Sequence, residues 1–188
     1  FRMGAITAGL NHVRHYYETR YRIDGYLQQK GFDPEGKISS YHRTEKGITS
    51  FINKITPLGF DYVNAGESTI IVSNEKNGTI GPNSFAYYQS ATHDITVFQQ
   101  LFSTNYRFFA LILGHEIQHA LYHYSGIYNN WAKNNSDIWA YRETEVRAYQ
   151  WQIDYSSNTI RAPWNGPYSV YSFYSGQNKY KSLQKLGK

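Results

Sequence analysis

Residues 106–124 read YRFFALILGHEIQHALYHY, and this segment decides how the chain folds. Its apolar side chains recur at helical spacing, which predicts one long helix with a buried stripe. Thr104 or Asn105 can cap the start of this helix, and Gly126 can end it. The stripe consists of Leu113, Ile117, Ala120, Leu121 and Tyr124. Two histidines of the segment lie on the other side of the helix, where they can face a cleft.

Within this helix, residues 115–119 read His-Glu-Ile-Gln-His. Positions four apart share a helical face, so His115 and His119 can direct two imidazole nitrogens at one metal ion. Glu116 lies about 100° around the helix, where its carboxylate can reach water on the metal without binding the ion. Zinc lowers the pKa of such a water to about 7, and the glutamate accepts the proton as the water attacks a carbonyl. The motif predicts metal-assisted peptide hydrolysis with Glu116 as general base.

A catalytic zinc site also needs a third protein ligand and one open position. His123 follows His119 by four residues, but it stands about 12 Å from His115 along a continuous helix. That distance is too great for His123 and His115 to share one ion, because zinc–nitrogen bonds are about 2 Å long. We therefore expect His123 to be a surface or cleft histidine.

The third ligand is expected from a second helix, over residues 138–152. This helix carries Glu143 and Glu145, which lie about 200° apart around its axis, so only one of them can face the metal. Glu143 can form an ion pair with Arg147 on a solvated face. Glu145 shares the core-directed face with Ile138, Tyr141, Ala148, Tyr149 and Gln152. On this facing argument we expect Glu145 to be the ligand, with Glu143 as the alternative.

The pattern of two histidines followed by Glu145-x-x-Ala148 resembles the gluzincin metallopeptidases. In that family a second helix supplies a glutamate ligand, with a small residue three positions on. The resemblance covers residues 84–152 and implies Zn²⁺ bound by His115, His119 and Glu145. Many members place Asp or Asn directly after the small residue to support a zinc ligand, whereas Tyr149 stands there in this chain.

The resemblance also implies a zincin-like α+β fold. It would contain a small antiparallel or mixed sheet, an active-site helix and a second ligand-bearing helix. Strands are predicted at residues 60–63, 69–72, 85–89 and 95–98, with a turn at Asn77-Gly78, and helices at residues 12–29 and 47–55. In zincins, the strand before the metal helix edges the cleft and pairs with extended substrate. Either Phe85–Tyr88 or Ile95–Phe98 can be that strand.

The composition fits a globular protein of 188 residues, with 40% hydrophobic and 18% charged residues. By its length we expect a single metallopeptidase-like domain over residues 1–188. The chain has no Cys, which excludes thiolate zinc sites, disulfides and cysteine nucleophiles and leaves His and carboxylate ligands. No apolar run approaches the roughly 18 residues of a membrane span.

The charge balance is basic, with 19 Lys and Arg against 14 Asp and Glu. A nucleic-acid-binding domain is one alternative, because 19 Tyr and 10 Phe could provide stacking surfaces. The basic residues are spread along the chain, however, apart from a short C-terminal run, and no recognisable nucleic-acid module is present. A second alternative is a catalytically silent zincin-fold binding module. The intact Glu116 argues against that alternative, because a structural metal site does not require this carboxylate.

The opening residues, FRMGAITAGLNH, resemble the Gly- and Ala-rich junction that follows the core of Rhs-type polymorphic toxins. Because the chain begins at Phe1, we expect a fragment or processed form. Residues 1–16 would then be the junction, and residues 156–188 a C-terminal extension. In such toxins the variable C-terminal domain is often a metallopeptidase, encoded beside an immunity protein. The resemblance implies secretion or delivery within a longer effector, with a protein or peptide substrate and a cognate immunity protein as partners.

Overall fold

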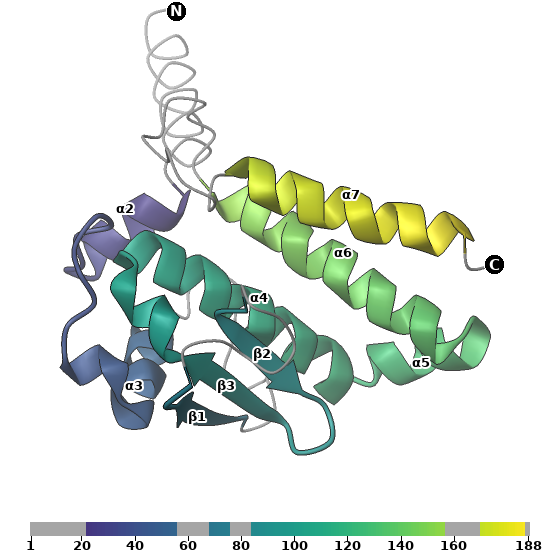
Figure 1. The fold of residues 1–188 in the computed structure, drawn as a ribbon, viewed down its shortest axis with the longest axis horizontal. Coiled ribbons are helices and arrows are strands. Elements are labelled where there is room, and N and C mark those ends of the chain that lie inside the picture. The colour runs from purple at the N-terminus through teal and green to yellow at the C-terminus, as the bar shows by residue number, and fades with distance from the viewer. Residues whose placement is uncertain (1–21, 56–67, 76–83, 157–169, 187–188) are drawn as a thin grey trace, which may run out of the picture.

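The computed structural model describes residues 22–55, 68–75, 84–156 and 170–186. These residues form an α+β structure with a small mixed sheet, as the sequence predicts (Figure 1). The expected strand at residues 60–63, the turn at residues 77–78, the junction and most of the helix at residues 12–29 lie outside the described residues. The elements are α2 (Arg22–Gln29), η1 (Tyr41–Arg43), α3 (Glu45–Ile55), β1 (Thr69–Ser73), β2 (Ala86–Gln89), β3 (Asp94–Phe98), η3 (Gln99–Ser103), α4 (Tyr106–Tyr124), α5 (Ile127–Asn134), α6 (Asp137–Tyr155) and α7 (Val170–Leu186).

The described strands form one sheet in the order β1-β3-β2. Strand β3 pairs with β1 in parallel and with β2 in antiparallel orientation. Its side chains from Ile95 to Phe98 are buried, which explains why this strand reads as an almost unbroken apolar run. Strand β2 is an edge of this sheet and lies beside α4 (Figure 1). Of the two strands that could edge the cleft, β2 therefore holds that position.

Helix α4 is the central element, between the sheet and α6 (Figure 1). Asn105 caps it, because its side chain accepts a hydrogen bond from the Phe108 N–H at 2.9 Å. All but one of the residues from Tyr106 to Ala120 are buried, so the helix is covered on all sides. The predicted stripe is wrong at its end, since Tyr124 is 60% exposed. The last turn of α4 still contacts the sheet through His123, whose ring lies 5.4 Å from that of Tyr88 in β2.

Helix α5 occupies the Asn-rich segment between α4 and α6. Gly126 has φ of 76°, a left-handed conformation that glycine adopts without strain. This residue ends α4 as predicted, and it also begins α5. The connection between the two helices that carry the candidate ligands is therefore itself a short helix.

Helix α6 begins at the predicted cap, where the Ser136 hydroxyl accepts a hydrogen bond from the Trp139 N–H at 3.1 Å. Its predicted core-directed face is wrong at Ile138 and Tyr141, which are 63% and 48% exposed. The buried residues of α6 include three small ones that are four positions apart, and they are Ala140, Thr144 and Ala148. Helix α6 packs against α4, α5 and α7.

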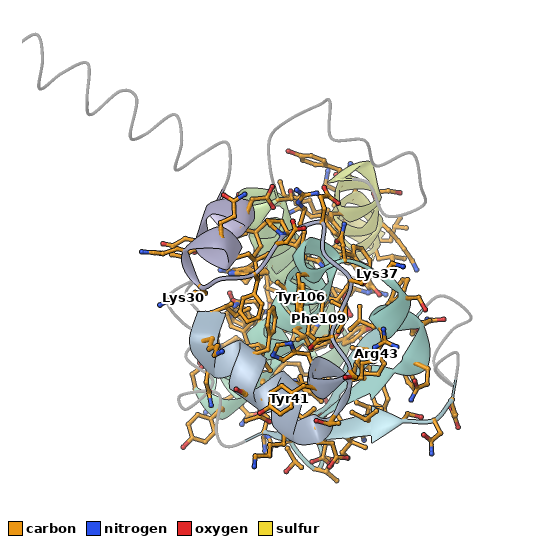
Figure 2. The ribbon with its side chains drawn as sticks, turned by 90° about the vertical axis from the view of Figure 1, so that its left-hand side faces the viewer. Lys30, Lys37, Tyr41, Arg43, Tyr106 and Phe109 are labelled. Atoms are coloured by element: carbon orange, nitrogen blue, oxygen red, sulfur yellow. The ribbon has the colours of Figure 1, made fainter. Side chains whose placement is uncertain are left out.

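The N-terminal helices pack against the first half of α4. The apolar face of α3 is completely buried, and Phe51 meets the Phe109 ring at 5.0 Å. Figure 2 shows Phe109 beside Tyr106 of the same helix, α4. Tyr106 stacks on the same Phe51 ring at 5.6 Å. Helix α2 is tied to α4 by Arg107, whose guanidinium donates two hydrogen bonds of 2.6 Å to the Asp24 carboxylate. These contacts fix the start of the helix that carries the histidines.

Helix α7 makes up most of the expected C-terminal extension and packs along α6 (Figure 1). Phe173 joins the main hydrophobic core, so α7 is an integral part of the structure. No helix in the described part of the chain is long and apolar enough to cross a membrane.

The ion pair between Asp24 and Arg107 provides a test of this packing. Replacing Asp24 with Ala leaves the buried Arg107 guanidinium with Glu35 as its remaining carboxylate partner, and we expect a loss of about 1–3 kcal/mol in the free energy of unfolding, measured in urea. As a control, Asp154→Ala removes an exposed carboxylate that hydrogen-bonds only Gln150, and should cost no more than about 0.5 kcal/mol. Equal costs for the two variants would contradict the role of Asp24.

Candidate metal centre

Helices α4 and α6 bring three candidate ligands to one point. The Nε2 atoms of His115 and His119 are 3.2 Å apart. Glu145 approaches both, with Oε2 3.5 Å from His115 Nε2 and Oε1 3.7 Å from His119 Nε2. In a tetrahedral site with bonds of about 2.0–2.1 Å, neighbouring ligand atoms lie about 3.4 Å apart. The three separations therefore fit one zinc ion with a fourth position open to water.

The ligand side chains are removed from solvent. They are 10–12% exposed, and within the described residues they are the one group of His, Cys, Asp or Glu side chains whose atoms converge in this way. Burying a carboxylate is costly unless it is paired or bound to a metal. The convergence of two imidazoles and one carboxylate fits the ligand chemistry of zinc.

Burial and neighbouring charge set the protonation of the ligands. Burial lowers the pKa of His119 to about 4, so its imidazole is neutral at pH 7. Burial opposes a charge on Glu145, but the charges of His119 and His115 outweigh it and lower the pKa of the carboxyl group to about 2. For His115, the hydrogen bond to Glu145 and the nearby carboxylates outweigh burial and raise the pKa. A metal ion at this point would displace the proton of His115.

Gln152 of α6 supports His115 from outside the ligand set. Its Nε2 atom donates to the Leu111 carbonyl oxygen at 3.1 Å, which orients the amide with Oε1 toward His115. His115 Nδ1 lies 3.1 Å from that Oε1 and must donate, because an amide oxygen only accepts. The Nε2 atom of His115 is then the one left to bind a metal. Gln152 therefore selects the imidazole tautomer that the site requires.

Glu116 lies beside the ligands and is held by the sheet. Its Oε2 atom accepts a hydrogen bond of 2.9 Å from the Tyr88 N–H of strand β2. Burial raises the pKa of Glu116 to about 7, against the opposing effects of His115 and the Tyr88 amide. A carboxyl group whose pKa lies near neutrality can both accept and release a proton at physiological pH.

A cleft of about 540 Å³ opens over these residues. Helix α4 contributes the histidines and Glu116, β2 lines one side, and α6 and α7 line the other. The start of α4 gives the cleft an apolar end, lined by Phe85, Phe108, Ile112 and Phe173. The other end is lined by tyrosines and by His123, whose ring stacks on Tyr128 at 4.0 Å. His123 is thus a cleft histidine and does not join the metal cluster.

Glu143, the alternative ligand, points away from this cluster. Its Oε1 atom accepts a 2.7 Å hydrogen bond from Arg147, so the predicted ion pair is present. The expectation of a solvated glutamate is wrong, because its side chain is only 15% exposed. Helix α7 covers it, and Gln184 donates a 2.8 Å hydrogen bond to Oε2.

The sequence does not indicate the roles of two parts of the site. It places Gln152 on the same face as Glu145, two helical turns on, but does not reveal the hydrogen bonds of Gln152 to His115 and Leu111, because these join residues far apart in the chain. The Tyr88 amide is a backbone group, and only the register of β2 reveals its direction.

Comparisons with protein-family models, with curated proteins and with solved structures gave no significant match. The function of the chain is therefore inferred from the residues of the site and their geometry.

The two glutamates provide the first test of the site. Glu145→Ala should remove a ligand and lower zinc affinity sharply, because only two protein ligands remain. Glu143→Ala is the matched control on the same helix. It removes the acceptor of both Arg147 and Gln184 and should leave zinc affinity unchanged, at a stability cost of about 1–3 kcal/mol. Zinc affinity is measured by competition with a chelator. The reverse order of affinities would identify Glu143 as the ligand.

The role of Gln152 is tested separately. Gln152→Leu removes the acceptor for His115 Nδ1, and we expect zinc affinity to fall about 10–100-fold, as is usual when a partner of a ligand is lost. Gln28→Leu is the same substitution at an exposed position of α2 and should leave zinc affinity unchanged. If both variants bind zinc as tightly as the original chain, Gln152 does not orient His115.

Proposed function

We propose that this chain is a zinc-dependent peptidase of the gluzincin type. His115, His119 and Glu145 would hold the zinc ion, and Glu116 would be the general base. One observation carries the proposal. The two imidazole nitrogens lie 3.2 Å apart, each has a Glu145 carboxylate oxygen within 3.7 Å, which is close to the spacing around tetrahedral zinc, and a buried carboxyl group with a pKa of about 7 lies beside them.

The residues have separable tasks in peptide hydrolysis. When bound, zinc would supply an activated water and polarise the carbonyl group of the scissile peptide. The Tyr88 N–H holds Oε2 of Glu116, which leaves Oε1 to accept a proton from the water as its oxygen bonds to the carbonyl carbon. Glu116 then passes this proton to the amide nitrogen as the C–N bond breaks. The products carry a new carboxyl and a new amino terminus.

Strand β2 supports an extended polypeptide as the substrate. The Phe98 N–H donates to the Phe85 carbonyl oxygen at 3.0 Å, and hydrogen-bonded pairs alternate along an antiparallel ladder. Ala86 and Tyr88 therefore belong to pairs without inter-strand hydrogen bonds. Their backbone groups point away from β3, toward the side where Glu116 lies. A substrate strand can add to this edge and bring its peptide bonds past the metal position.

The arrangement of elements supports a zincin-like fold for the chain. A small mixed sheet, an edge strand beside the histidine helix and a ligand on a second helix are the features that the gluzincin resemblance implies. Delivery within a longer toxic effector, and a cognate immunity protein, are further parts of the proposal. They rest on the Rhs-like opening residues, which lie outside the described part of the chain.

The alternatives receive less support. Among the described residues, none that lines the cleft is Lys or Arg, which disfavours this surface as a nucleic-acid site. A silent module that keeps zinc for stability would not need Glu116 to be buried beside the ligands and held by a backbone amide. Hydrolysis therefore accounts for more of the site than either alternative.

Catalysis and metal binding are separated by Glu116→Gln. This variant should keep its zinc content and fold, because Glu116 is not a ligand, and should lose about 10²–10⁴-fold in peptide hydrolysis. Zinc is measured by elemental analysis and hydrolysis with a peptide library. Glu143→Gln is the matched control and should keep full activity, whereas His119→Ala should lose both zinc and activity. Undiminished hydrolysis by Glu116→Gln would exclude the proposed mechanism.

A further inference from the structure

Tyr149 stands at the position where many gluzincins have Asp or Asn. Its ring covers the candidate ligand His115. The Tyr149 and His115 rings meet edge to face, with centroids 4.8 Å apart and an interplanar angle of 71°. On its outer side, Tyr149 stacks on Tyr180 of α7 at 6.1 Å. Tyr149 therefore lies between the ligand histidine and the C-terminal helix.

Gly176 allows α7 to come this close. A Cβ atom at position 176 would lie 2.4 Å from Cζ and 2.5 Å from Cε1 of Tyr149, well inside van der Waals contact. Glycine is unfavourable inside a helix compared with alanine, and Gly176 lies inside α7, which begins at Val170 and ends at Leu186. The close approach of the α7 backbone to the Tyr149 ring accounts for a glycine at this position.

Polar contacts fix where α7 lies along α6. The buried Gln177 donates hydrogen bonds to the Val146 carbonyl oxygen at 3.2 Å and to Gln150 Oε1 at 2.7 Å. Further along, Arg142 donates to the Leu183 carbonyl oxygen at 2.5 Å. These contacts hold α7 in one register, so Gly176 stays opposite the Tyr149 ring.

We propose that α7 positions a ligand of the metal centre. Gly176 lets the backbone of α7 pack against the Tyr149 ring, and this contact holds the ring against the imidazole of His115. The inference rests on the proposed zinc site and adds a positioning role for Tyr149. Gln152 fixes one edge of His115 through a hydrogen bond, and the Tyr149 ring blocks rotation of the imidazole out of that bond. A ligand that is held in place before the metal arrives loses less conformational entropy on binding.

The test compares zinc affinities of point variants in the full chain, by chelator competition. Gly176→Ala should lower zinc affinity about 10–100-fold, although alanine favours the helix. Asn178→Ala is the matched control, since it also favours the helix but lies on an exposed position of α7. Its zinc affinity should equal that of the original chain. The imidazole NMR resonances of His115 should shift in Gly176→Ala and stay in place in Asn178→Ala.

Variants at Tyr149 show whether the effect passes through the ring. Tyr149→Phe keeps the ring and should bind zinc within about twofold of the original chain, whereas Tyr149→Ala should lose about as much affinity as Gly176→Ala. In the Tyr149→Ala background, adding Gly176→Ala should change affinity less than about twofold, because the clash is gone. A full additional loss in that background would overturn the inference.

The outcomes separate this inference from the proposed function. If the original chain binds zinc and Gly176→Ala binds it equally tightly, the role of α7 is refuted while the peptidase proposal stands. If the original chain binds no zinc, the metal site fails and the role of α7 fails with it. Circular dichroism of each variant checks the fold, and Tyr149→Phe keeps the test decisive if Tyr149→Ala does not fold.

Discussion

The close packing of α6 on α4 is the contact on which the site depends. Ala140, Thr144 and Ala148 are small and fully buried, so the two helix backbones can approach each other. A larger side chain at these positions would move Glu145 away from the histidines by more than a metal–ligand bond tolerates. Gln152, two turns beyond Glu145, hydrogen-bonds α4 at both Leu111 and His115. The same interface thus supplies a ligand and the group that orients another.

This interface concentrates ionisable groups where solvent cannot reach them. His115, Glu116, His119 and Glu145 are all buried or nearly so, and hydration that would stabilise their charges is replaced by contacts within the cluster. Glu145 is paired with two imidazoles, whereas Glu116 has one backbone N–H and a raised pKa. The two carboxyl groups of the cluster therefore have different pKa values. The lowered pKa of Glu145 suits metal binding, and the raised pKa of Glu116 suits proton transfer.

The local parts of the structure are predictable from the sequence, and the relations between distant parts are not. Caps, the face of α3 and the strand positions follow from local spacing, and so does the separation of Glu143 from Glu145. The exposure of Ile138, Tyr141 and Tyr124 depends on how each helix lies against its neighbours. The periodicity of the sequence does not contain this information. The same holds for the cover that α7 provides over Glu143, and for the direction of the Tyr88 N–H. These features arise from tertiary contacts between residues far apart in the chain.

The position of α7 in the chain has a consequence for synthesis. Helices α4 and α6 leave the ribosome first, with both histidines and Glu145 already present, but α7 follows only afterwards. Until then, Tyr149 has no helix behind it and the cleft lacks part of one wall. A newly made chain therefore exposes these candidate ligands before α7 can cover them, and the order of translation delays completion of the cleft until α7 has been made.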